Sequence, residues 1–239
     1  MSKKEIYILI GGGCFIVVCT VAVLFGGFYY LFPLLEAQME PVQEIVTVEA
    51  VTLPNPNGLT LGDPNAKVTI EVFEDFQCPA CKQFSDQIEP LIVQNLITTG
   101  KAKYMFRHYP FIDGPGAGDG GESDQTANAA MCANEQGKFW EMKSVLYANW
   151  DGENQGSFSD RRLEAMADSI HLDMNSFRDC FSSNTYIDLI QADYEYGNDM
   201  EIYGTPTVLV NGVRVGEKGY IASYQEIVEA VEAAIRAAP

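Results

Sequence analysis

The sequence predicts an α/β protein with an inserted block of helices, preceded by a membrane-spanning helix. Three observations predict this arrangement. An uncharged apolar stretch occupies residues 6–32, and a β-branched segment at residues 67–76 runs into two closely spaced cysteines. The strand pattern returns at residues 207–215, after a long helical stretch. The chain has 239 residues, of which 47% are hydrophobic and 20% charged, enough for one globular domain plus an extension.

Residues 1–32 are expected to form a short cytoplasmic tip and a membrane anchor. The 27 residues from 6 to 32 carry no charge, whereas roughly 20 residues suffice to cross a hydrocarbon core as a helix. The apolar region of a cleaved signal peptide is shorter, at about 7–15 residues. Lys3 and Lys4 precede the stretch and acidic residues follow it. The positive-inside rule therefore predicts a cytoplasmic N-terminus and an extracytoplasmic remainder.

Residues 33–60 have the composition of a stalk, with four prolines, spaced acidic residues and the turn-rich sequence PNPNG. One short strand is expected within it, at residues 44–51. The remaining residues, 61–239, are expected to form the folded domain. The formal net charge of −18 excludes nucleic acid and anionic lipid headgroups as ligands of that domain, since such a surface repels both.

The first half of the predicted domain alternates strand, helix and strand. Residues 67–76 are β-branched and aromatic, and residues 82–99 space their apolar side chains at helical intervals. Gly100 is the expected end of that helix, and a second strand is expected at residues 102–108. Cysteines 78 and 81 therefore lie at a strand-to-helix turn.

The second half begins with a helical block at about residues 122–200, interrupted near 149–157 and 182–184. Two strands are expected on either side of Asn211-Gly212, which is a strong two-residue hairpin turn. Ser223 and Glu226 form a capping box that opens a final helix.

This order of elements is that of a thioredoxin fold with a helical insertion. The segments LGDPNAKVTIEVFEDFQCPACKQF, CANEQGKFWEMKSVLY and YGTPTVLVNG together resemble the DsbA family of thiol:disulfide oxidoreductases, over about residues 59–239. The resemblance implies that Cys78 and Cys81 form a disulfide and that this disulfide exchanges with the thiols of another protein. It implies no bound cofactor.

The position of Cys78 gives a physical reason for this chemistry. A free cysteine has a pKa near 8.5 and supplies little thiolate at neutral pH. At the N-terminus of a helix, unpaired amides and the helix dipole stabilise a negative charge, each by on the order of 1 kcal/mol. Pro79 at the first helical position removes no needed hydrogen bond. We therefore expect Cys78 to be the nucleophile and Cys81, one turn further and facing inward, the resolving thiol.

The resemblance assigns roles to further residues. Pro79 and Ala80, between the cysteines, tune the redox potential, and the histidine of some strongly oxidising members is missing. Thr205 and Pro206 match the cis-proline loop that lies against the active cysteines and faces the substrate. The family places a buried acid six residues before the nucleophile, where this chain has Val72. Glu74 is the expected substitute, with a solvated surface charge as the alternative.

Cys132 and Cys180 are expected to form a structural disulfide in an oxidising compartment. Two separate buried thiols and a second redox pair are the alternatives. No metal is expected, because the cysteine and histidine spacings fit neither a zinc ribbon nor a finger. Covalent haem would require a histidine after the second cysteine, and residue 82 is lysine.

The function expected from the resemblance is donation of the Cys78–Cys81 disulfide to exported polypeptides by a single-pass protein of the bacterial cell membrane. A membrane-embedded, quinone-linked partner, either DsbB-like or similar to vitamin K epoxide reductase, would reoxidise the pair. The alternatives are a reductase or isomerase of the same fold and a non-catalytic, membrane-tethered peptide-binding or chaperone module. The expected chemistry requires sulfurs that a client can reach and that lie near Pro206.

Overall fold

In a computed structural model of the chain, the structure describes residues 43–49, 51–113 and 120–238. The unit described below starts at Glu44. The predicted membrane anchor, residues 6–32, lies outside the described residues. Within the described ranges, no helix has the length and apolar character needed to span a bilayer.

A five-stranded sheet with the strand order β1-β3-β2-β4-β5 forms the centre of the unit. Its strands are β1 (Thr60–Leu61), β2 (Thr69–Glu74), β3 (Lys103–His108), β4 (Thr207–Val210) and β5 (Val213–Arg214). The β2–β3 pair is parallel, and the other pairs are antiparallel. Four of these five strands were expected from the sequence. Strand β1 was not, and the described part of the short strand expected at residues 44–51 is not a strand.

Strand β2 is almost entirely buried because both faces of the sheet are covered by helices. Ile70 and Val72 point into the main core, which also contains the buried side chains of the last helix, α9 (Tyr224–Ala237). Phe73 points the opposite way and packs with Leu209 against α8 (Ile187–Asp199). The alternation of side chains along a strand places Glu74 on the same face as Val72.

The helix expected at residues 82–99 is instead three successive pieces. They are α2 (Pro79–Gln87), α3 (Glu89–Ile92) and a π-helical turn, η1 (Val93–Ile97). Pro90 explains the break, since a proline in a helix interior lacks the N–H donor and its ring clashes with the carbonyl four residues earlier. The Ile88 N–H closes α2 by donating to the Phe84 carbonyl.

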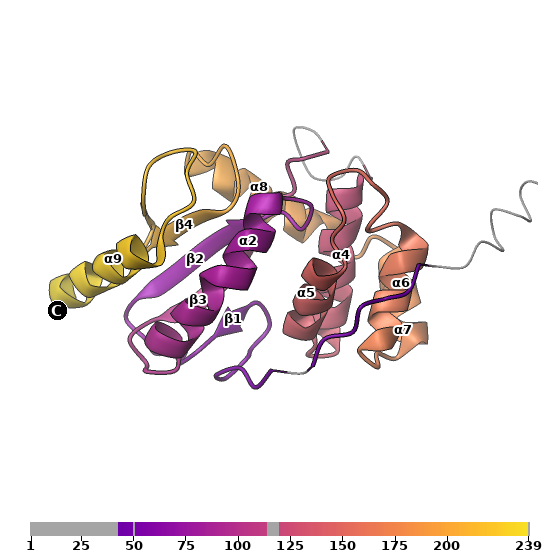
Figure 1. Cartoon of the computed structure of the whole chain (residues 1–239), viewed down its shortest axis with the longest axis horizontal. Coiled ribbons are helices and arrows are strands. Elements are labelled where there is room, and N and C mark those ends of the chain that lie inside the picture. The colour runs from indigo at the N-terminus through magenta and orange to yellow at the C-terminus, as the bar shows by residue number, and fades with distance from the viewer. Residues whose placement is uncertain (1–42, 50, 114–119, 239) are drawn as a thin grey trace, which may run out of the picture. The chain divides into compact units, whose positions relative to one another are not determined.

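The inserted block comprises α4–α8, and Figure 1 shows α4, α5, α6 and α7 grouped beside the sheet. The bounds are α4 (Glu122–Glu135), α5 (Phe139–Ala148), α6 (Asp160–Ser169) and α7 (Met174–Ser182), followed by α8. The predicted helical stretch of residues 122–200 thus contains five helices in the structure. After it, Asn211 and Gly212 have φ angles of 49° and 78°, as a two-residue hairpin turn requires. The Ser223–Glu226 capping box is also formed.

Part of the segment expected to be a stalk lies against the folded unit. Ile45, Leu53 and Leu59 pack on the main core. The side chain of Asn149 hydrogen-bonds both backbone groups of Val46, at 2.9 Å to its N–H and 2.8 Å to its carbonyl. Parts of residues 45–59 are therefore held against the folded unit by specific contacts.

Candidate active site

Cys78 is the N-cap residue of α2, and Pro79 occupies the first turn of that helix. The residue enters the helix from an extended backbone conformation, with φ −71° and ψ 121°. Cys81 lies one turn further along, on the buried side of α2. Both thiols are free in the structure.

The loop before β4 brings Thr205 and Pro206 against the cysteines. The Thr205–Pro206 peptide bond is cis. The Cys78 thiol donates a hydrogen bond to the Thr205 carbonyl at 3.3 Å. This contact follows from the sheet register, in which Thr207 of β4 pairs with Phe73 near the end of β2. Two segments far apart in the sequence therefore meet at one end of the sheet.

The two sulfurs have opposite electrostatic environments. A hydrogen bond from Cys81 lowers the pKa of Cys78 to about 7, helped by the Thr205 side chain and the Cys81 and Ala80 amides. These contributions outweigh burial, which acts in the other direction. Burial raises the pKa of Cys81 well above its ordinary value, and the neighbouring Cys78 and Glu74 charges add to this. Cys78 is therefore the thiol that ionises first.

Cys78 is less exposed to solvent than expected for a thiol that a client must reach. The residue is 5% exposed and Cys81 is 0% exposed. The Thr205 carbonyl is one of the groups that contact the Cys78 sulfur. A cleft of about 200 Å³ lies beside the pair, lined by Ala80, residues 203–207, Arg214 and residues 218–221. The cleft therefore lies next to the turn between the two cysteines, because Ala80 lines it.

Glu74 lies in the interior beneath the cysteines and is 1% exposed, which contradicts its alternative as a solvated charge. Its carboxylate accepts hydrogen bonds from the Tyr147 hydroxyl at 2.7 Å and the Tyr104 hydroxyl at 3.2 Å. The Lys143 ammonium is 3.5 Å away. Burial raises the pKa of Glu74 to about 7, against the lowering effect of Lys143 and with a further increase from Glu89. The group therefore exchanges its proton near neutral pH.

Lys143 and Tyr147 were missed by the sequence analysis, although α5 carries a signal for them. Phe139, Lys143 and Tyr147 follow one another at four-residue intervals and so share one helix face. Because Phe139 marks that face as apolar, a lysine in the same row is expected to be buried and paired. In the structure it is 2% exposed and also lies 2.6 Å from Glu89.

The residues before Cys78 are held by a second buried network. The Gln77 side chain is completely buried and donates to Ser123 at 2.9 Å, while Trp150 donates to the Gln77 carbonyl at 2.7 Å. Asp75 accepts from the Gln77 N–H at 2.9 Å and from the Ser123 hydroxyl at 2.8 Å. This network ties the approach to the active-site turn to α4 and to the loop after α5.

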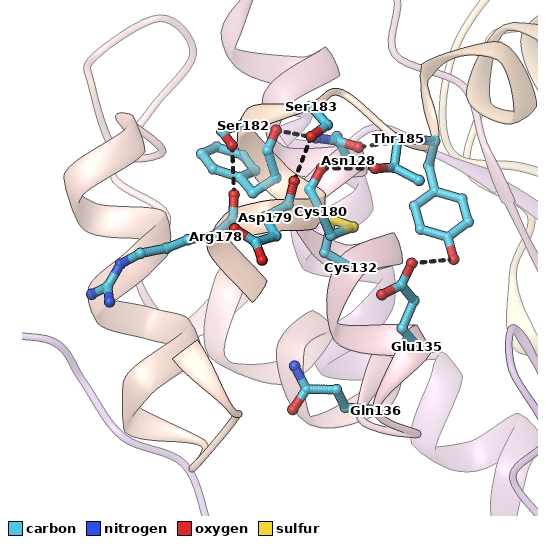
Figure 2. The surroundings of a disulfide bond; sticks show 12 residues. Asn128, Cys132, Glu135, Gln136, Arg178, Asp179, Cys180, Ser182, Ser183 and Thr185 are labelled. Carbon is cyan, nitrogen blue, oxygen red and sulfur yellow. Dashed lines mark hydrogen bonds between the residues drawn. A yellow bond between two sulfur atoms is a disulfide. The ribbon is translucent and has the colours of Figure 1, made fainter. Parts of the chain in front are cut away.

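Cys132 of α4 and Cys180 of α7 form a disulfide, with 5.8 Å between their Cα atoms. Figure 2 shows the polar side chains around it. Asn128 donates to the Phe181 carbonyl at 3.1 Å, and Thr185 donates to the Cys180 carbonyl at 3.0 Å. The bond joins two helices of the inserted block. Among the described residues, no three His, Cys, Asp or Glu side chains are grouped as a metal site would require.

Comparison with known proteins assigns the chain to a family. The family model described as Thioredoxin matches residues 54–230. The chain belongs to the thioredoxin family. The match starts before β1 and ends within α9, so it includes the sheet, the cysteine pair and the inserted helices.

Two curated relatives of this thioredoxin-family protein differ in how much of their length it covers. The Na(+)/H(+) antiporter NhaA 3 of Salinispora tropica is 32% identical over 154 residues, and the match covers 64% of this chain. This chain spans only 21% of that antiporter's length. Disulfide bond formation protein D of Bacillus subtilis is 26% identical over 173 residues, which are 72% of this chain and 74% of the relative.

Solved structures share the fold of this thioredoxin-family protein. Oxidised BdbD from Bacillus subtilis has a TM-score of 0.66 and 25% sequence identity, covering 81% of this chain and 100% of the other. DsbA from Chlamydia trachomatis has a TM-score of 0.59 and 21% identity, covering 82% and 98%. The second likeness concerns the fold alone.

Proposed function

We propose that this protein is a thiol:disulfide oxidoreductase that donates the Cys78–Cys81 disulfide to exported polypeptides. The observation that carries the proposal is the environment of Cys78. Its sulfur lies at the N-terminus of α2, 3.3 Å from the Thr205 carbonyl, and its pKa is lowered to about 7. The thiolate, which is the reactive form, is therefore abundant at neutral pH.

The reaction begins with the pair oxidised. A client thiolate attacks Cys78, the Cys78–Cys81 bond breaks, and Cys81 leaves as a thiolate. A second client thiolate then attacks the client sulfur of the mixed disulfide, and Cys78 leaves. The client loses two electrons and two protons and gains a disulfide, while the pair is reduced to two thiols.

Glu74 is proposed to supply the proton that Cys81 needs. The pKa of Cys81 is raised well above its ordinary value by burial, so its thiolate takes up a proton soon after release. Glu74 has a pKa of about 7, raised by burial, and its charge acts on Cys81. Such a group is half protonated near neutral pH and can return to that state after each transfer.

The proposed setting is the outer side of a bacterial cell membrane, with residues 6–32 as a single-pass anchor and the N-terminus in the cytoplasm. A DsbB-like or vitamin K epoxide reductase-like membrane partner would accept the electrons of the reduced pair. The name of the Bacillus subtilis relative, disulfide bond formation protein D, supports the direction of the reaction. The lowered pKa of Cys78 supports it too, because stabilising the reduced form makes the disulfide more oxidising.

Oxidative refolding of a reduced protein with several disulfides tests this function. The oxidised full chain should restore the activity of the client, and the Cys78→Ser variant should not. Equal behaviour of the two would favour the non-catalytic peptide-binding module. The equilibrium of the pair with glutathione then separates donor from reductase, since a donor is reduced at glutathione ratios that leave a reductase oxidised.

A further inference from the structure

The cleft beside the cysteine pair lies between two loops. One wall is the loop of residues 203–207, and the other is the loop of residues 218–221, between β5 and α9. Its volume of about 200 Å³ is smaller than the roughly 300–1,000 Å³ of a site for a drug-sized molecule. The space suits one or two side chains of an extended peptide.

Two aromatic rings stand at the rim of this cleft. Tyr203 is 65% exposed and Tyr220 is 73% exposed. Of the Phe, Trp and Tyr residues in the part of the chain that the structure describes, only these two are exposed. Both line the cleft. Exposed aromatic residues are characteristic of binding surfaces, so their restriction to this cleft marks the place where a client lies.

Lys218 adds a positive charge at the same rim. Its ammonium group lies 3.9 Å from the centroid of the Tyr203 ring, in a cation–π contact. Lys218 is exposed, and none of the described carboxylates forms an ion pair with it. The contact with the ring holds the ammonium near the cleft without neutralising it.

This local charge contrasts with the rest of the chain. The formal net charge is −18, which disfavours the approach of acidic polypeptides in general. Arg214, the other cationic side chain of the cleft, is bound to the loop itself, donating to the Thr207 hydroxyl at 3.2 Å and to the Glu201 carbonyl at 2.8 Å. Lys218 therefore differs from Arg214 in forming no hydrogen bond with the described residues, and its ammonium group can turn towards a bound peptide.

We propose that Lys218 is a specificity-determining residue that favours clients with an acidic side chain within a few residues of the reacting cysteine. The inference rests on the proposed function, because it concerns the choice among clients of the Cys78–Cys81 pair. The client backbone would lie along the Thr205 loop, with its acidic side chain on Lys218 and a neighbouring side chain between Tyr203 and Tyr220.

Three matched dithiol peptides test the inference. They share one sequence with two cysteines and differ only at the residues flanking the first cysteine, which are Asp, Asn or Lys. The rate of peptide oxidation by the oxidised full chain is measured at low salt by acid quenching, alkylation and mass spectrometry. The Asp-to-Lys rate ratio should be roughly fivefold higher in the wild type than in Lys218→Gln, as expected for the loss of one exposed charge interaction. The ratio should fall further in Lys218→Glu.

Lys101→Gln is the matched control, because it makes the same charge change on an exposed residue that precedes β3, at the opposite end of the sheet. It should keep the wild-type ratio. Oxidation of the Asn peptide, which has no charge beside the cysteine, tests the proposed function independently of Lys218. If the Asn peptide is oxidised but the Asp-to-Lys ratio is the same in wild type and Lys218→Gln, the inference about Lys218 is wrong and the enzyme remains. If no peptide is oxidised, the proposed function fails and the inference with it.

Discussion

Glu74 and Lys143 form an ion pair in the protein interior, with 3.5 Å between a carboxylate oxygen and the ammonium nitrogen. Glu89 lies 2.6 Å from the same ammonium. Two carboxylates therefore share one cation, and the cluster carries an excess negative charge unless it holds a proton. The raised pKa of Glu74, at about 7, follows from its burial and from this shortage of positive charge. The cluster lies close enough to the active-site turn for the charge of Glu74 to raise the pKa of Cys81.

Replacing Glu74 by Gln should slow peptide oxidation by on the order of 100-fold, which is the lower range for loss of a general acid–base group. The wild-type rate should change with pH around the pKa of Glu74, about 7, and this change should be smaller in Glu74→Gln. Stopped-flow rates between pH 5 and 9 measure both effects. Glu71→Gln is the control, because Glu71 is on the same strand but faces away and pairs with Arg107 at 3.0 Å. An unchanged rate in Glu74→Gln would contradict the proton-transfer role.

Replacing Lys143 by Met should destabilise the fold in a pH-dependent way. Without the ammonium, the pKa of Glu74 in the folded state rises further, because Lys143 acts to lower it. A carboxyl group with a raised folded pKa binds its proton more tightly in the folded state. The stabilisation of the fold by this bound proton is fully present below the pKa of the unfolded state, 4.5. It is lost as the pH rises through the pKa of the folded state. In urea unfolding, the free energy of unfolding of Lys143→Met should be slightly below that of the wild type at pH 4.5. At pH 8 it should be lower by about 3–5 kcal/mol. A deficit that does not change with pH would exclude this coupling.

The low pKa of Cys78 should depend most on Cys81 and less on Thr205. Cys81→Ala removes the largest contribution that lowers the pKa, and Thr205→Val removes the hydroxyl. Both variants should shift the thiolate absorbance at 240 nm to higher pH, with the larger shift in Cys81→Ala. The buried Thr205 hydroxyl oxygen has no hydrogen-bond partner among the described residues, so its removal should leave the fold in place. A wild-type midpoint of 8.5 or above would remove the activation argument.

Loss of the Cys132–Cys180 disulfide should affect stability and leave the chemistry intact. The cysteines are 48 residues apart, and closing a loop of that length stabilises the folded state by roughly 4 kcal/mol in the chain-entropy model. The double variant Cys132→Ala, Cys180→Ala should unfold at lower urea concentration and oxidise peptides at the wild-type rate once folded. If peptide oxidation is lost in the folded double variant, the second pair takes part in electron transfer.

Features set by a few neighbouring residues were predictable from the sequence. Cys78 and Pro79 start α2, Asn211 and Gly212 form the hairpin turn, and Ser223 caps α9. In each case a local backbone preference agrees with the final fold. The break in the first long helix was also local, because Pro90 carries the signal, but it was overlooked.

Features that depend on distant segments were not predictable in the same way. Strand β1 has two residues, and only its pairing with β3 makes it a strand. The spacing within α5 indicates a buried, paired lysine, but it does not indicate that Glu74 of β2 is the partner of Lys143. The contact of the Cys78 sulfur with the Thr205 carbonyl depends on how the loop before β4 lies against the start of α2. These contacts arise from tertiary packing rather than from local preference.

The central claim is that Cys78 is the sulfur that exchanges with a client, and trapping the mixed disulfide tests it most directly. A Cys81→Ala variant of the full chain cannot expel the client. It should therefore accumulate a covalent adduct with a single-cysteine peptide activated as a mixed disulfide. Peptide mapping by mass spectrometry should find the adduct on Cys78. No adduct, or one on Cys132 or Cys180, would contradict the account.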